Sequence, residues 1–190
     1  MIFFTSDLHH KHKNICQFTN RHKFTSQEKH DEWLANLWNT TVAPTDKVWH
    51  LGDFSFTHKY DEIAEYVSTL NGQKFFIKGN HDRRENLDKL KADGLIQNWY
   101  DYKEIKIGET KVVLFHYPIS AWHQQHRDSL MLHGHCHGSF TGKGKILDVG
   151  LDSAFNITGE HTFFREEDIK SYVDLKNLYI ADHHRPREGE

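Results

Sequence analysis

The N-terminal stretch IFFTSDLH, residues 2–9, runs from four residues typical of a buried strand directly into an Asp-x-His pair. A short apolar run of this kind favours a β-strand, and the polar residues after it indicate where the strand ends. The same order, an apolar run followed within three residues by Asp, Asn or His, recurs at residues 47–51, 74–77, 111–115 and 129–132. The pattern predicts a set of short strands that present polar side chains at their carboxyl ends.

Two of the intervening segments have apolar residues at helical spacing. Residues 28–38 and 60–70 each carry four large apolar side chains on one side of a helix. Strand, helix and strand in that order predict parallel pairing through crossover helices, whereas the part after residue 99 is richer in strands separated by Gly-containing turns. The sequence therefore predicts an α/β layered sandwich with mixed sheets.

The length and composition predict a single folded domain. The chain has 190 residues, 37% of them hydrophobic, and one domain is expected at roughly 150 residues per domain. We assign residues 1–181 to this domain and residues 182–190 to a polar C-terminal tail. The formal net charge of -3 argues against a protein that coats long duplex nucleic acid.

No segment is apolar enough for a signal peptide or a membrane span. The only two cysteines, Cys16 and Cys136, do not make a disulfide framework. Together these features predict a cytoplasmic protein that does not associate with membranes.

Carboxylates and histidines gather directly after the predicted strands. The carboxyl ends of strands in a parallel or mixed sheet collect on one edge, and the loops there form a ligand-binding crevice. Each segment alone is weak evidence, because Gly, Asp and Asn are ordinary turn residues and a lone histidine is more often structural. The five segments together favour one shared site. They are Asp7-Leu8-His9, Gly52-Asp53, Gly79-Asn80-His81-Asp82, His116 and Gly134-His135-Cys136-His137.

This set of oxygen and nitrogen donors suits divalent cations. Mixed carboxylate and imidazole ligands favour Mn, Fe, Co, Ni or Zn, whereas pure Mg or Ca sites use fewer histidines. Seven ligands are too many for one tetrahedral ion but suit two ions roughly 3.5 to 4 Å apart that share a carboxylate, for which Asp53 is the candidate. The seven predicted ligands are Asp7, His9, Asp53, Asn80, His116, His135 and His137.

The ordered motifs resemble the calcineurin-like metallophosphoesterase superfamily, and over residues 1–152 the chain resembles its small uncapped predicted phosphoesterases. The resemblance implies a four-layer αββα sandwich in which two mixed β-sheets are flanked by helices. It implies two divalent metal ions, with Mn preferred and Fe, Ni, Co or Zn as alternatives. The first ion would be bound by Asp7, His9, Asp53 and His137, and the second by Asp53, Asn80, His116 and His135.

The resemblance also assigns His81, next to Asn80, to the leaving-group oxygen as general acid. A water held between two cations loses a proton near neutral pH and can attack phosphorus in line, after which His81 protonates the departing alkoxide. Asp82 is a candidate for orienting the His81 imidazole. Candidate substrate contacts are His12, the two phosphate-suited cations Arg21 and Arg83, and Trp122.

The predicted function is hydrolysis of a small phosphomonoester or phosphodiester, with nucleotides and cyclic nucleotides among the candidate substrates. The superfamily's Ser/Thr phosphatases carry a downstream Asp-Arg after Gly-Asp, which the sequence GDFSF at residues 52–56 lacks. A nuclease of the same superfamily and a non-catalytic protein-binding scaffold are the alternatives, and the retained His81 argues against the scaffold. The sequence indicates no obligate protein partner.

Overall fold

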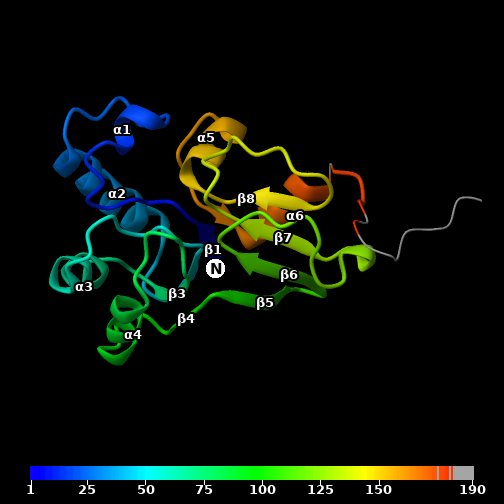
Figure 1. Cartoon of the computed structure of the whole chain (residues 1–190), viewed down its shortest axis with the longest axis horizontal. Helices are drawn as coiled ribbons and strands as arrows, with labels where there is room; N and C mark the ends of the chain where they lie inside the picture. Colours follow the sequence, from blue (N-terminus) through cyan, green and yellow to red (C-terminus); the bar gives the residue numbers. More distant parts are fainter. Residues whose placement is uncertain (175, 180, 182–190) are drawn as a thin grey trace, which may run out of the picture.

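The computed structural model describes residues 1–174, 176–179 and 181, and the predicted polar tail at 182–190 lies outside the described residues. The fold consists of two β-sheets with helices around them (Figure 1). The strands are β1 (Ile2–Thr5), β2 (Lys47–His50), β3 (Gln73–Ile77), β4 (Asn98–Tyr100), β5 (Tyr102–Ile107), β6 (Thr110–Phe115), β7 (Leu130–His133), β8 (Ile146–Asp148) and β9 (Phe164–Arg165). The helices are α1 (Ile15–Phe18), α2 (Gln27–Thr41), α3 (Tyr60–Ser68), α4 (Arg84–Ala92), α5 (Leu151–Thr158), α6 (Glu166–Asp174) and the 3-10 helix η1 (Gln125–Arg127).

Both sheets are mixed. Sheet 1 has the order β4-β3-β2-β1-β9, in which β1 to β4 are parallel and β9 runs antiparallel to β1. Sheet 2 has the order β5-β6-β7-β8, in which only the β5–β6 pair is antiparallel. The predicted α/β sandwich with two mixed sheets flanked by helices is therefore confirmed.

The alternation of side chains along β1 builds two separate cores. Phe3 points toward the helices and packs in a buried cluster with Leu34 and Trp38 of α2. Phe4 points the other way and packs in a second cluster with residues such as Leu132 of sheet 2. Successive strand residues face opposite sides of a sheet, so two adjacent phenylalanines stabilise both layers. Each contributes about 1.5–3 kcal/mol relative to an exposed side chain.

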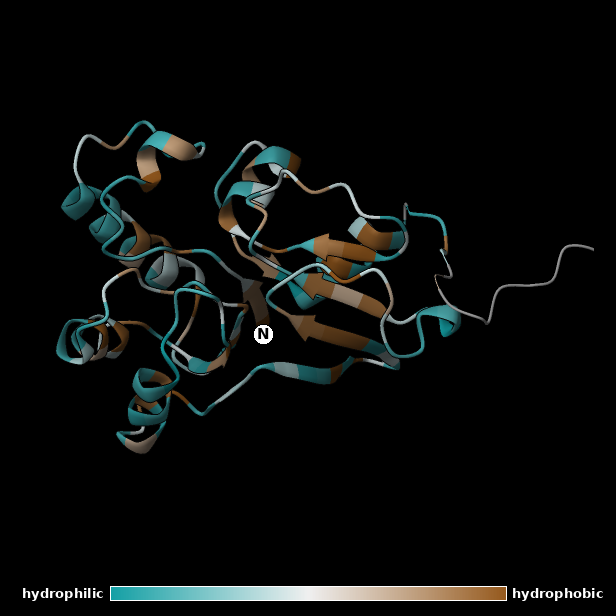
Figure 2. Cartoon of the chain, in the orientation of Figure 1, coloured by the Kyte–Doolittle hydropathy of each residue, from teal (hydrophilic) through white to brown (hydrophobic). Residues whose placement is uncertain are grey.

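The outer face of sheet 2 is covered by the segment that contains Trp122. The Trp122 side chain is only 7% exposed and packs with Val113, Met131 and Ile146, and its indole N–H donates to the Ser129 carbonyl over 3.1 Å. The expectation that Trp122 contacts substrate is not met, because the side chain forms part of this core. Figure 2 shows hydrophobic residues along β6, β7 and β8, whereas the outer strand β5 is more hydrophilic.

The predicted elements match the structure closely in the first half of the chain. The helical segment expected at 28–38 is α2, and the one expected at 60–70 is α3. Helices α4, α5 and α6 were not expected, because α4 and α6 have few apolar positions and α5 is only 8 residues long. In the described part of the chain, no helix combines the length and hydropathy that crossing a membrane requires.

Candidate metal centre

The predicted ligands lie in the loops that follow five strands, and the backbone of these loops is strained. Positive φ angles occur at Asp7 (56°), His9 (55°), Asp53 (56°), His135 (70°) and His137 (48°), which are five of the eight non-glycine residues with positive φ in the described part of the chain. This conformation costs a non-glycine residue about 1–2 kcal/mol. Its concentration at predicted ligands indicates that the loops are shaped to aim these side chains.

Glycines in the motifs allow the loops to approach one another. A Cβ on Gly52 would lie 2.5 Å from His116 Nδ1, and one on Gly134 would lie 2.5 Å from Asp7 Oδ2. A Cβ on Gly79 would overlap the Asp53 carboxylate and its backbone nitrogen. These glycines are therefore required by close packing of the loops, which is a stronger constraint than turn formation alone.

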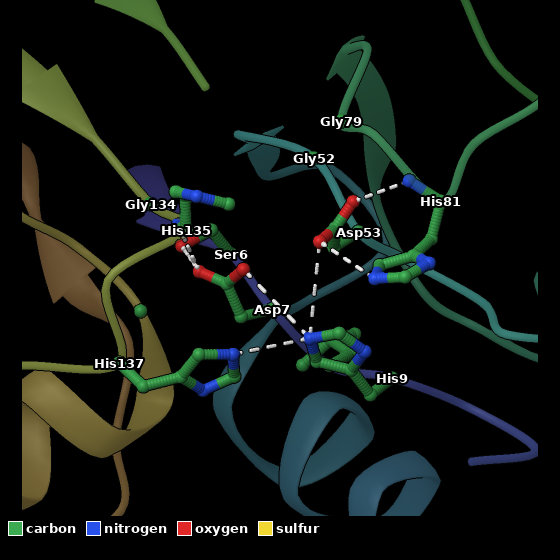
Figure 3. Close-up of polar contacts among 12 residues, drawn as sticks. Ser6, Asp7, His9, Gly52, Asp53, Gly79, His81, Gly134, His135 and His137 are labelled. Atoms are coloured by element: carbon green, nitrogen blue, oxygen red, sulfur yellow. Dashed lines mark hydrogen bonds and ion pairs between the residues drawn. The ribbon is translucent and has the colours of Figure 1, made fainter. Parts of the chain in front are cut away.

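Asp7, His9 and His137 form the first ligand group. One ligand atom of each lies within 4.8 Å of the others. His9 Nε2 lies 3.2 Å from His137 Nε2 and 3.9 Å from Asp7 Oδ1. In Figure 3 the two imidazoles and the Asp7 carboxylate point toward a common centre.

Asp53, His116 and His135 form the second ligand group, again with ligand atoms within 4.8 Å of one another. The Asn80 Oδ1 atom lies 3.0 Å from His116 Nε2, so it joins this group. Asp53 Oδ2 lies 3.4 Å from His116 Nε2 and 3.9 Å from His9 Nε2. The Asp53 carboxylate is thus between the two groups, and all seven predicted ligands come together.

The residues present fit divalent cations. Asp7 Oδ1 is buried without a hydrogen-bond partner, and burial raises the pKa of this carboxyl to about 6. A buried carboxylate oxygen without a partner is unfavourable unless a cation or proton compensates it. Burial also lowers the pKa of His9 well below its usual range, which keeps the imidazole neutral, as a metal ligand must be. Carboxylate, amide and imidazole donors together match first-row divalent ions.

Acceptors behind the ligands fix the imidazole orientations. His116 Nδ1 lies 2.7 Å from the Leu51 carbonyl oxygen, and His137 Nδ1 lies 2.7 Å from Asp152 Oδ2. Because a carbonyl and a carboxylate accept, Nδ1 carries the hydrogen in both rings. Nε2 is then free to bind a cation, as in other carboxylate–histidine–metal arrangements.

Arg21 connects the loop that carries Asp7 to Asp152, the residue that contacts His137. Its guanidinium has no exposed surface and donates to Asp152 from Nε (3.1 Å) and Nη2 (2.9 Å). The same guanidinium donates to the backbone carbonyls of Asp7 (2.6 Å) and Leu8 (2.8 Å). The expectation that Arg21 contacts substrate is therefore corrected: the side chain holds the Asp7 loop and, through Asp152, the His137 ring.

Asp82 has a different role from the expected one. Its carboxylate accepts hydrogen bonds from the backbone N–H groups of Gly79 (2.8 Å), Asp53 (2.9 Å) and Phe54 (3.1 Å). Burial, with the nearby charge of Asp53, raises the pKa of the Asp82 carboxyl. Asp82 therefore ties the loop after β2 to the loop after β3 and does not orient the His81 imidazole.

His81 lies at the edge of the site. Its backbone N–H donates to Asp53 Oδ1 over 2.9 Å, and its Nε2 lies 3.9 Å from Asp53 Oδ2. The side chain is 38% exposed, so it can reach a bound molecule. Burial tends to raise the pKa of Asp53, but the hydrogen bond and charge of His116, the backbone hydrogen bond from His81 and the charge of His9 outweigh it and hold that pKa below its usual range.

The ligands open into a cleft of about 570 Å³, whose lining includes His9, His12, His81 and His135. His12, expected as a substrate contact, is thus in the cleft, and its ring stacks on Phe56. Arg83, the remaining expected contact, is exposed and follows Asp82, where it lines a separate small pocket with His81. Sequence reasoning missed Phe56, which lies three residues after Asp53, and Asp152, which follows none of the five motifs.

Comparison with known proteins relates the sequence to one family and the fold to a solved structure. The sequence profile of the calcineurin-like phosphoesterases matches residues 1–189. The Gene 66 protein of Mycobacterium phage L5 is 30% identical, over 80% of this chain and 86% of the phage protein. An uncharacterized protein of Methanocaldococcus jannaschii is 30% identical, over 73% of this chain and 70% of that protein. The crystal structure of a protein of unknown function from Aquifex aeolicus has the same fold, with a TM-score of 0.67 and 22% identity, and covers 91% of this chain and 99% of its own.

Proposed function

This chain belongs to the calcineurin-like phosphoesterase family, and we propose that it hydrolyses a small phosphomonoester or phosphodiester with the aid of two divalent cations. The observation that carries the proposal is the convergence of seven donor side chains in one place beside the cleft, with the Asp53 carboxylate between two groups of predicted ligands. Strained backbone at five of these residues supports a functional role for the site.

We assign the ligands to two overlapping sets that share Asp53, and we propose Mn as the ion at both. When bound, such a pair of cations polarises the phosphoryl oxygens and lowers the pKa of water to near neutrality. The first set is Asp7, His9, Asp53 and His137, and the second is Asp53, Asn80, His116 and His135.

His81 is the proposed general acid. Its imidazole lines the cleft, is partly exposed and is attached to the loop that carries the ligand Asn80. A protonated His81 transfers its proton to the leaving oxygen as the bond to phosphorus breaks, and it regains a proton from water. The backbone hydrogen bond to Asp53 holds this residue beside the ligands.

The size of the cleft supports a small substrate. About 570 Å³ is in the usual range for a small-molecule site and holds one compact organic phosphate. The free cysteines Cys16 and Cys136 support the cytoplasmic location that we also propose. We propose that the chain acts without an obligate protein partner.

Metal removal tests the proposed function. We expect the metal-stripped protein to be inactive on a chromogenic phosphodiester and to regain turnover with Mn, and a panel of monoesters, cyclic nucleotides and polynucleotides defines the substrate. His81→Ala should retain two ions per chain and lose about 10²–10⁴-fold in kcat. The matched control is His123→Ala, an exposed histidine paired with Glu104, which should keep full activity. Turnover without metal, or full activity in His81→Ala, would contradict the assignment.

A further inference from the structure

Three aromatic rings form a continuous surface beside the metal centre. Phe56 stacks on His12 with ring centroids 4.0 Å apart and an interplanar angle of 8°. The ring centroid of His12 lies 6.4 Å from that of Phe18, the last residue of α1, and the ring centroid of Phe56 lies 4.8 Å from that of His81. We call Phe18, His12 and Phe56 the aromatic wall.

The aromatic wall leaves unusual amounts of apolar surface in water. Phe18 is 71% exposed and Phe56 is 39% exposed, whereas Phe54, two residues before Phe56, is 1% exposed. Large apolar side chains that gather at the surface beside a cleft are typical of binding sites. His12 covers one face of the Phe56 ring, and part of the ring surface remains open to a ligand.

The wall lies where the organic part of a substrate would be. His9, a ligand of the first group, is 5.2 Å from His12 between ring centroids, and the proposed acid His81 contacts Phe56. His81 must touch the leaving oxygen, so the group attached to that oxygen extends along Phe56 and His12. Phe18 and Ile15 line the cleft that His9, His12 and His81 also line.

We propose that the aromatic wall binds a planar ring carried by the leaving group, so that the substrate is a phosphoester of a nucleoside or of an aryl-substituted alcohol. The proposal rests on the proposed function and names its substrate class. Aromatic side chains stack on any flat π-system, whereas a saturated chain of the same size gains only apolar contact. The polar recess beside Phe18, about 370 Å³ and lined by Gln17, Thr19 and Asn156, could receive hydrogen-bonding groups of the ring.

Matched substrates separate stacking from reactivity. We would compare benzyl phosphate with cyclohexylmethyl phosphate, whose leaving alcohols are similarly basic, and adenosine 5′-phosphate with ribose 5-phosphate. The expected result is a preference of roughly tenfold or more in kcat/KM for the planar member of at least one pair. A preference in the first pair identifies an aryl ring, and one in the second pair identifies a nucleoside.

Single substitutions test whether the aromatic wall causes the preference for planar substrates. Phe56→Leu and Phe18→Leu keep apolar bulk without a planar ring and should abolish most of the preference, mainly through KM. Phe140→Leu is the control, because Phe140 is 43% exposed and its ring packs edge-on against His133, which is neither a predicted ligand nor part of the wall, and it should retain the preference. Equal kcat/KM within both pairs, or a preference unchanged in both wall variants, would overturn the proposal.

A binding measurement distinguishes failure of this inference from failure of the proposed function. Ligand-detected NMR on the metal-stripped protein needs no turnover and compares adenosine with ribose and benzyl alcohol with cyclohexylmethanol. Binding of a planar member that weakens in Phe56→Leu supports the wall even if no ester is hydrolysed. Hydrolysis without any planar preference, in rate or binding, would leave the proposed function standing and overturn the wall.

Discussion

The His137 imidazole is held by a carboxylate that is itself held by a guanidinium. Asp152 is 1% exposed, accepts from His137 Nδ1, and forms two hydrogen bonds with the fully buried Arg21. Burial tends to raise the pKa of Asp152, but His137 and Arg21 outweigh it and keep the carboxyl ionised. The charge behind the ring fixes its tautomer and would strengthen it as a ligand of a bound cation. This chain of contacts makes Arg21 and Asp152 positioning residues for the first ligand group.

We expect Asp152→Asn to weaken metal binding by about 10- to 100-fold, because His137 loses its negatively charged partner. Arg21 would be left with an uncompensated buried charge, so unfolding free energy should fall by about 3–5 kcal/mol. Calorimetric titration with Mn measures the first effect, and urea unfolding measures the second.

Asp46→Asn is the matched control for Asp152→Asn. Asp46 is 6% exposed and pairs with the Met1 amino group at the start of β1, whereas the ligands follow the end of that strand. This variant should lose stability but bind Mn normally. Wild-type metal affinity in Asp152→Asn would show that the carboxylate does not tune the site.

Sequence reasoning identified the residues that follow apolar runs and failed for those that act from a distance. The seven predicted ligands could be placed near one another from the sequence because each lies within a few residues of a strand end, where the fold brings loops together. Arg21 and Trp122 were assigned to substrate because they are of suitable type, and only the structure shows that both side chains are buried. Asp152 is 131 residues from Arg21, so no local pattern reveals their pairing.

At the scale of secondary-structure elements, the loops that follow the strands shape the candidate site as much as the strands do. The positions of β1, β2, β3, β6 and β7 followed from apolar runs. Helix α4 could not be predicted, because it buries only Asn86, Leu87 and Leu90 and, apart from Ala92, its other residues are polar. The left-handed backbone of Asp7 and Asp53 was equally inaccessible, because Asp tolerates that conformation without requiring it. The loop after β2 and the loop after β3 are joined by Asp82 and by the packing of Gly79 against Asp53.

Gly79→Ala tests whether that packing controls the metal centre. An added Cβ overlaps the Asp53 carboxylate and backbone, so the shared ligand must move. We expect kcat to fall about 100-fold, since a displacement near 1 Å has that effect in active sites, and we expect one or both ions to be lost. Activity assays and metal analysis of the purified variant check this outcome.

Gly108→Ala separates general backbone strain from damage to the site. Gly108, in the turn between β5 and β6, has a φ of 56° and nothing within 4 Å of an added Cβ. This variant should lose about 1–2 kcal/mol of stability through strain and retain both ions. If Gly79→Ala also kept both ions and normal kcat, loop packing would not determine the geometry of the ligands.

At the scale of the molecule, the candidate metal centre joins the two sheets. Asp7, His9, Asp53 and Asn80 follow strands of sheet 1, whereas His116, His135 and His137 follow strands of sheet 2. The apolar core between the sheets, which includes Phe4 and Leu132, holds the two sheets together. Each ligand group contains donors from both sheets, so cations that bind there cross-link the sandwich.

Metal binding should therefore stabilise the whole fold. At a free Mn concentration 100 times the dissociation constant, one bound ion adds about 2.7 kcal/mol, which raises Tm by roughly 5 to 11 °C for a chain of this size. Thermal unfolding of metal-stripped protein with and without Mn measures the shift, and a chelator should reverse it. His123→Ala, which removes an exposed histidine, should show the same shift, whereas His137→Ala should show a smaller one. An identical shift in His137→Ala would mean that Mn stabilises the protein elsewhere on its surface, because removal of a ligand from one group must weaken the link between the sheets.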